Sequence, residues 1–171
     1  MARALIVGCG CRGRRLAKLL AGEGWAVRGT TRRDRNLAAI EAAGAEAALA
    51  DPDRPGTVLG LVGDVTVVHW LLGSALGEPE AMAAIHGPRL ERLLEKLVDT
   101  PVRGFVYEAV GTVSRQQLET GQRIVESAGR TWRIPFAIIG ADPGDYDGWL
   151  DAAAAATDRV LGNEPRAASR E

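Results

Sequence analysis

Short runs of apolar, often β-branched residues alternate along the chain with longer amphipathic stretches. The runs predict six strands, at residues 3–7, 26–29, 45–49, 65–70, 103–107 and 134–139. The stretches between them predict helices at residues 14–22, 36–43, 88–98, 116–128 and 148–161, and a loop at residues 73–79. The strand runs are almost uniformly apolar, which is typical of strands covered by helices on both faces. The pattern therefore predicts an α/β fold with an open, doubly wound parallel sheet of about six strands.

The domain organisation follows from the same pattern. The chain has 171 residues, an ordinary size for one domain, and it shows no repeat of fixed period and no long linker. We expect one Rossmann-type domain over residues 1–162 without a separate substrate domain. The remaining residues, 163–171, read as a polar tail.

Composition and charge narrow the function classes. Lys and Arg number 21 and Asp and Glu 22, which gives a net charge of −1 and argues against binding of nucleic acid or a membrane surface by bulk charge. No apolar run approaches the roughly 20 residues that cross a bilayer. Cys9 and Cys11 are too close for an ordinary disulfide and too few for a zinc site. We expect a cytoplasmic protein without a metal site.

A glycine turn joins the first predicted strand to the first helix. Residues 8–13 read Gly-Cys-Gly-Cys-Arg-Gly, a G-x-G-x-x-G pattern with a strand before it and a helix after it. Gly8 permits the tight turn, Gly10 lets a diphosphate approach the backbone, and Gly13 lets the helix pack on the strand. Cys11 and Arg12 complete the turn at the positive end of the helix dipole. The pattern predicts a dinucleotide site, and a glycine-rich turn without a ligand is the alternative.

The same residues allow a second ligand class. Residues 7–10 resemble the first motif of S-adenosylmethionine-dependent methyltransferases. Those motifs usually carry an acid two residues before the first glycine, where this chain has Ile6. They also place the third glycine one residue earlier, where this chain has Arg12. The two departures favour the dinucleotide.

The end of the second strand bears on which dinucleotide binds. An NAD site usually has an acid about 20 residues beyond the glycines, where it meets the ribose hydroxyls. Here Thr31 and Arg32 come first and Asp34 follows. An arginine matches a phosphate in charge and shape, so the sequence favours NADP over NAD. The alternative is a solvated helix start that Asp34 caps, with the arginines merely exposed.

With these features in hand, the sequence resembles the short-chain dehydrogenase/reductase superfamily, in particular atypical members related to extended NAD-dependent epimerases and NmrA-like proteins. The resemblance runs from residues 4–10 to residues 133–139 and includes residues 104–107, which are similar to the family's fifth strand. It implies that Asp51, after the third strand, meets the adenine amino group. Residues 64–71 are similar to the fourth-strand motif, so Leu71 would line the cofactor ribose.

Catalytic residues are where this chain departs from the family. Active members need a Ser or Thr just after strand five and a Tyr-x-x-x-Lys on the next helix, where the tyrosine shuttles a proton. Those positions hold Val110, Leu118 and Gln122, and the chain's tyrosines are Tyr107 and Tyr146. The resemblance thus predicts a cofactor site without the usual proton relay, and we assign no catalytic residue. Extended members also add a C-terminal substrate region.

Two functions stay open. One is a reductase or epimerase-like enzyme in which Glu108, Thr112 or water donates the proton, since burial of Glu108 could raise its pKa. The other is a non-catalytic sensor of NAD(P), as in some NmrA-like proteins, which would signal to a protein partner. We expect His69, Cys9 and Cys11 to serve packing more than chemistry, with redox sensing by the two cysteines as the alternative. The sequence leaves the substrate, the partner and a homodimeric assembly open.

Overall fold

The computed structural model describes residues 1–163; the predicted polar tail, apart from Asn163, lies outside the described residues. The chain runs through β1 (Arg3–Val7), α1 (Cys11–Gly22), β2 (Ala26–Thr31), η1 (Asp34–Asn36), α2 (Leu37–Ala42), β3 (Glu46–Leu49), α3 (Pro55–Leu59), β4 (Val67–Trp70), α4 (Pro79–Ile85), α5 (Pro88–Leu97), β5 (Gly104–Glu108), α6 (Arg115–Trp132), β6 (Phe136–Ile139) and α7 (Tyr146–Val160).

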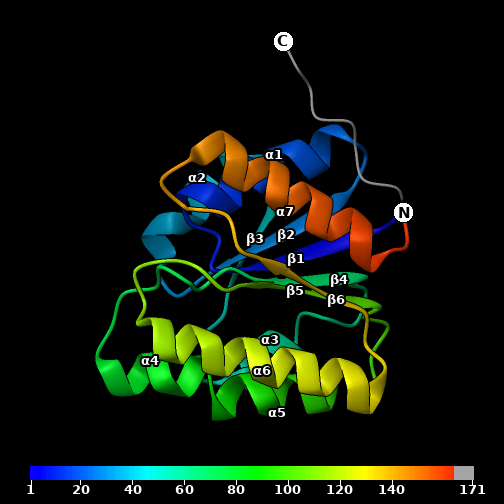
Figure 1. Ribbon diagram of the computed structural model, residues 1–171. Helices are drawn as coiled ribbons and strands as arrows, with labels where there is room; N and C mark the ends of the chain where they lie inside the picture. Colours follow the sequence, from blue (N-terminus) through cyan, green and yellow to red (C-terminus); the bar gives the residue numbers. More distant parts are fainter. Residues whose placement is uncertain (164–171) are drawn as a thin grey trace.

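The strands form one six-stranded sheet in the order β3-β2-β1-β4-β5-β6, and every neighbouring pair is parallel. The chain therefore builds outward from β1 to β3, returns to the other side of β1, and builds outward again to β6. Helices α1, α2 and α7 cover one face of the sheet and α3 to α6 cover the other (Figure 1). The predicted doubly wound parallel α/β sheet is confirmed.

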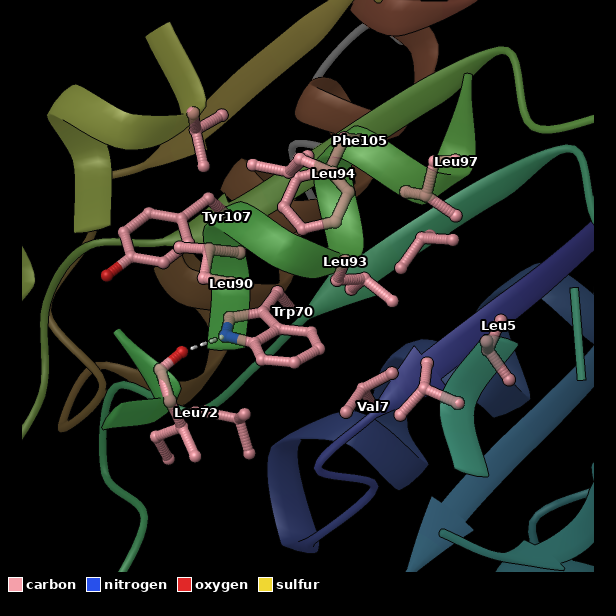
Figure 2. Packing of buried hydrophobic residues seen from close by; sticks show 14 of the residues in the cluster. Leu5, Val7, Trp70, Leu72, Leu90, Leu93, Leu94, Leu97, Phe105 and Tyr107 are labelled. Atoms are coloured by element: carbon pink, nitrogen blue, oxygen red, sulfur yellow. Dashed lines mark hydrogen bonds between the residues drawn. The ribbon is translucent and has the colours of Figure 1, made fainter. Parts of the chain in front are cut away.

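Burial on both faces explains why the strand sequences are so apolar. All residues of β4 and β5 are buried, and side chains from alternate positions enter separate cores on the two faces. The core beneath α3 to α6 contains Trp70 and Phe105, against which the leucines of α5 pack (Figure 2). The indole N–H of Trp70 donates to the carbonyl of Ile85 at 3.2 Å, so this large side chain is buried without losing a hydrogen bond.

Several element bounds differ from the prediction. α1 begins at Cys11 and not at residue 14, because the glycine turn itself supplies the first helical turn, with Gly10 as its N-cap. β4 begins at Val67 and not at residue 65, since the amide of Val65 donates to Val62 in a turn. β6 begins at Phe136 because the preceding Pro135 has no N–H to give to a strand ladder.

Three short elements were not predicted: η1, α3 and α4. Each spans only three to seven residues, too few to show a helical period. Pro55 and Pro79 stand at the first positions of α3 and α4, where a proline signals a helix start. The predicted loop at residues 73–79 is present and ends where α4 begins.

Candidate functional site

The loops that follow β1 and β4 leave the sheet in opposite directions, because the strand order reverses between these two strands. Such a reversal opens a crevice at the carboxyl ends of the strands, where ligands bind in open α/β sheets. Here the crevice is a cleft of about 530 Å³. The sequence folds this way because the glycine turn follows β1 directly, while β4 continues into a loop of its own.

The three glycines of the turn meet different surroundings. Gly8 has φ +82, and a Cβ there would lie 2.5 Å from the carbonyl oxygen of Leu71. A Cβ on Gly13 would lie 3.2 Å from the oxygen of Gly8, so this glycine lets α1 pack on the turn. A Cβ on Gly10 would meet nothing within 4 Å. Packing thus accounts for Gly8 and Gly13, whereas the open side of Gly10 faces the cleft.

The residues predicted to bind the cofactor come together. All of them line the cleft: Gly8, Gly10, Cys11, Arg12, Gly13, Thr31, Arg32, Asp51 and Leu71. They lie at or just after the ends of four different strands, so the fold brings together residues that are more than 60 positions apart in the sequence. Sequence reasoning missed other lining residues, among them Asn36, Ser74, Met82 and Trp149. Trp149 carries no sequence signal, because its place depends on how α7 packs against α1.

Thr31 and Arg32 differ in how many hydrogen bonds their side chains already make within the protein. The Thr31 hydroxyl accepts from the Arg33 amide at 3.2 Å and from the Asn36 side chain at 3.4 Å, which shapes the turn into η1. Arg32 is exposed, and its Nη2 lies 3.5 Å from the Leu76 carbonyl oxygen in the β4–α4 loop. The alternative in which Asp34 caps the helix start is wrong on that point, because η1 has no side-chain cap. Arg32 therefore spans one end of the cleft.

Asp51 stands at the end of β3 in a tight turn. Its Oδ1 accepts from the amide of Asp53 at 3.0 Å, and its own amide donates to the Thr57 hydroxyl at 2.9 Å. The second bond ties the turn to α3, an element that the sequence pattern did not reveal. The turn fixes the position of the carboxylate at the cleft wall.

Glu108 is the most deeply buried charged side chain that lines the cleft, at 1% exposure. Its Oε1 accepts from the amide of Gly73 and its Oε2 from the indole N–H of Trp149, each at 2.8 Å. Arg12 lies on the same side, with its Nε 4.0 Å from Oε2. Burial raises the pKa of Glu108, while the two donors and Arg12 act in the opposite direction. The raised pKa that the sequence suggested for this residue agrees with its environment.

The two cysteines have different roles. Cys9 is buried, and a Cβ on Gly29 would lie 2.7 Å from its sulfur, so the glycine in β2 makes room for it. Burial raises the pKa of the Cys9 thiol to about 12, which disfavours a thiolate and agrees with the expected packing role. Cys11 is exposed and lines the cleft, so the packing role expected for Cys11 is wrong.

Both histidines are buried next to the site but outside its lining. His69 Nε2 donates to the Thr157 hydroxyl at 2.9 Å, since that hydroxyl gives its own hydrogen to the Ala153 carbonyl. Burial lowers the pKa of His69 to about 4. His86 bonds the Leu72 carbonyl through Nε2 at 3.0 Å and the Tyr107 hydroxyl through Nδ1 at 2.7 Å. Because Leu72 lines the cleft, the hydrogen-bonded pair of His86 and Tyr107 supports the wall of the cleft.

The positions where the family places its relay do not meet at the cleft. Leu118 is buried in the core under α6, and Gln122 donates to Glu126 on the same helix at 2.9 Å. Val110 precedes the point where the β5–α6 loop touches the β4–α4 loop, and a Cβ on Gly111 would lie 2.0 Å from the Gly73 oxygen. None of Val110, Leu118 and Gln122 is among the described residues that line the cleft.

Solved structures with the same architecture include epimerases and short-chain dehydrogenase/reductases. UDP-glucuronic acid 4-epimerase from Bacillus cereus, in complex with NAD, aligns with a TM-score of 0.65 and 16% identity, over 80% of this chain and 54% of the epimerase. A short-chain dehydrogenase/reductase superfamily protein from Agrobacterium tumefaciens with bound NAD aligns with a TM-score of 0.66 and 18% identity, over 80% and 48% of the two chains. The chain has the fold of NAD-dependent epimerases and short-chain dehydrogenase/reductases.

Alfalfa vestitone reductase gives the same result, with a TM-score of 0.62, 16% identity, and coverage of 81% of this chain and 56% of the reductase. The chain spans about half the length of these solved structures. No protein-family model matches the sequence, and no curated protein is significantly similar to it. At these identities the likeness concerns the fold.

Residues 1–163 contain neither a metal-binding cluster nor a membrane-spanning helix. Within residues 1–163, no group of three or more His, Cys, Asp or Glu side chains is arranged to hold a metal ion. No helix in this part of the chain has the length and apolar character needed to cross a membrane.

Proposed function

We propose that the chain binds a nicotinamide dinucleotide in the cleft, with NADP preferred over NAD, as an oxidoreductase-like protein of the short-chain dehydrogenase type. The glycine turn and the start of α1, residues 8–13, would hold the diphosphate. Thr31 and Arg32 would meet the adenosine ribose and its 2′-phosphate, and Asp51 and Leu71 would line the adenosine end. The epimerase and the Agrobacterium tumefaciens protein with this fold contain NAD, which supports the cofactor class.

The open space at Gly10 is the observation that carries this proposal. Neither the turn nor the helix packing needs a glycine at that position, since a Cβ there would meet no protein atom within 4 Å. A ligand that approaches the backbone closely would explain why this position is a glycine. The backbone N–H groups of the first helical turn and the dipole of α1 favour an anion at the same place.

A non-catalytic sensor of NAD(P) is the second candidate function. It is favoured by the residues at the family's relay positions, Val110, Leu118 and Gln122, none of which offers an acidic proton. Glu108 is the alternative donor for an enzyme, but both of its oxygens already accept hydrogen bonds. Turnover with a nicotinamide cofactor, lost on Glu108→Gln, would decide in favour of the enzyme.

The test of cofactor binding is Gly10→Val. Gly10 has φ −82, which valine adopts, so the protein should stay folded while the branched side chain fills the space that a diphosphate needs. We expect the dissociation constant for NADP, measured by calorimetry, to rise at least tenfold, about 1.4 kcal/mol.

Gly22→Val is the matched control. Gly22 ends the same helix, also meets nothing within 4 Å, and lies away from the cleft lining. It should leave the affinity for NADP unchanged. S-adenosylmethionine, which has no diphosphate, should not bind with comparable affinity. Unchanged NADP affinity in Gly10→Val would contradict the proposed site.

A further inference from the structure

Arg12 connects the glycine turn to the buried carboxylate of Glu108. Its guanidinium lies over the ring of Trp149, with Cζ 6.0 Å from the ring centroid, and its Nε is 4.0 Å from Glu108 Oε2. This Nε is buried and has no hydrogen-bond partner among the described residues. The side chain also lines the cleft. Arg12 is therefore held in place by the charge of Glu108 and by the indole ring of Trp149. Its Nε–H remains available to donate a hydrogen bond.

Glu108 is arranged as an anion. The Gly73 amide and the Trp149 indole both can only donate, so the ionised carboxylate satisfies them at both oxygens. The groups that face it are Arg12 from α1, Trp149 from α7, Gly73 from the β4–α4 loop, and its neighbour Tyr107 on β5. Of these, Arg12 alone carries a positive charge. The ionised state in a buried place thus depends on Arg12 staying close.

We propose that Glu108 positions Arg12 for the diphosphate, and that Glu108 takes up a proton when the diphosphate engages Arg12. This inference rests on the proposed dinucleotide site. A diphosphate competes with Glu108 for the guanidinium and adds negative charge at the start of α1, and both effects favour a neutral Glu108. The proton comes from solvent and bonds to a carboxylate oxygen, and no other bond forms or breaks.

The experiment measures protons taken up when NADP binds. Calorimetric titrations at one pH in buffers of different ionisation enthalpy give this number, and a pH series gives the affinity profile. For the wild-type protein we expect net uptake of up to one proton, with affinity falling by at most tenfold per pH unit as pH rises. Glu108→Gln should lose that uptake. Since the NADP 2′-phosphate can itself titrate near pH 6, the same titrations are run with NAD.

A second pair of variants keeps the test independent of how well Glu108→Gln folds. Arg12→Met keeps the apolar stem of the side chain over Trp149 and removes the charge. It should weaken NADP binding several-fold and reduce the proton uptake, because Glu108 is then already more protonated in the free protein. Arg15→Met is the matched control, since Arg15 pairs with Asp147 at 2.8 Å and lies outside the cleft lining. It should leave both quantities unchanged.

The outcomes separate the two proposals. Proton uptake that is the same in wild type and Glu108→Gln would overturn the coupling and leave the dinucleotide site standing. Uptake that persists fully in Arg12→Met would also overturn it. Failure of the wild-type protein to bind either dinucleotide would overturn the proposed function, and this inference with it.

Discussion

The two halves of the sheet end differently at the cleft. On the side of β1 to β3, the cleft is lined by the glycine turn with its open space at Gly10, and by Arg32, whose one contact to the opposite wall is a long one. On the side of β4 to β6, the loops pack against each other so closely that Gly73 and Gly111 leave no room for a Cβ. Glu108 lies beneath that contact with both oxygens bonded.

This difference bears on the function. In the proposed site the first half, which has open space at Gly10 and the exposed Arg32, would hold the adenosine and diphosphate. The second half would face the nicotinamide, where its polar groups bond one another. A nucleotide-binding half and a closed half together fit recognition of a cofactor better than they fit turnover of a large substrate. Changes in the closed half should therefore cost stability, and changes in the open half should cost binding.

The largest effect is expected for Gly111→Ala. The new Cβ would lie 2.0 Å from the Gly73 oxygen, which is a backbone atom and cannot move without displacing the β4–α4 loop. We expect the free energy of unfolding, measured by urea denaturation, to fall by about 3 kcal/mol.

Gly10→Ala is the counterpart in the open half. With nothing within 4 Å of the added methyl group, the free energy of unfolding should stay within about 0.5 kcal/mol of the wild-type value. If Gly111→Ala and Gly10→Ala were equally stable, the β4–α4 and β5–α6 loops would not pack as closely as their contacts indicate.

Acid should weaken the closed half through His69. Burial lowers the pKa of His69 from 6.5 to about 4 in the folded protein, so between these values the unfolded chain binds more protons. The contribution of the neutral His69 to the free energy of unfolding is therefore complete above pH 6.5. It is lost as pH falls toward 4, by up to about 3 kcal/mol. Urea denaturation across this pH range measures the loss.

His69→Gln isolates this effect. Glutamine can still donate to Thr157 but does not titrate. The lowered pKa of His86 acts in the same direction as His69, whereas the raised pKa of Glu108 gives stability at acid pH that is lost as pH rises. Both contributions remain in the variant, so the difference between the two profiles belongs to His69. Parallel profiles from pH 7 to pH 4 would show that His69 is not the cause.

The sequence predicts the fold well because the central strands β4 and β5 are buried on both faces and are therefore mostly apolar, although β3 at the sheet edge is exposed at Glu46 and Leu49. β4 and β5 were found on this signal alone, and the parallel sheet followed from the helices between the strands. The signal fails for α3 and α4, which are too short for a period and which a proline introduces. It also misplaces the start of α1, since residues 11–13 of the glycine turn are already helical.

The site was predictable where a residue's role depends on its own neighbours in the chain. The glycine turn and the end of β2 are of this kind, and all the residues predicted there line the cleft. The contacts of Glu108 could not be predicted, because Gly73 and Trp149 reach it from 35 and 41 residues away. The bond between His86 and Tyr107 was missed for the same reason: it joins a helix end to a strand across the core.

An effect no larger than that of Gly111→Ala is expected for the choice between the two dinucleotides in the open half. Arg32 is exposed at the end of β2, and no acid precedes it that would repel a 2′-phosphate. A charge-assisted hydrogen bond contributes roughly 1.5–3 kcal/mol, so the wild-type protein should bind NADP about tenfold to a hundredfold more tightly than NAD. Arg32→Ala should remove most of this preference and leave the NAD affinity nearly unchanged, because NAD lacks the phosphate.

Arg33→Ala is the companion variant for this comparison: Arg33 also lines the cleft, but side chains of adjacent residues in extended backbone point in different directions. It should change the preference less than Arg32→Ala does. Calorimetry at low and moderate salt is needed, because an exposed arginine–phosphate pair weakens as ionic strength rises. A wild-type preference for NAD at both salt concentrations would contradict the role of Arg32 and direct attention to Asp34, the first acid after β2. The open half would then recognise the ribose hydroxyls, as NAD sites usually do, and the arginines would be surface residues.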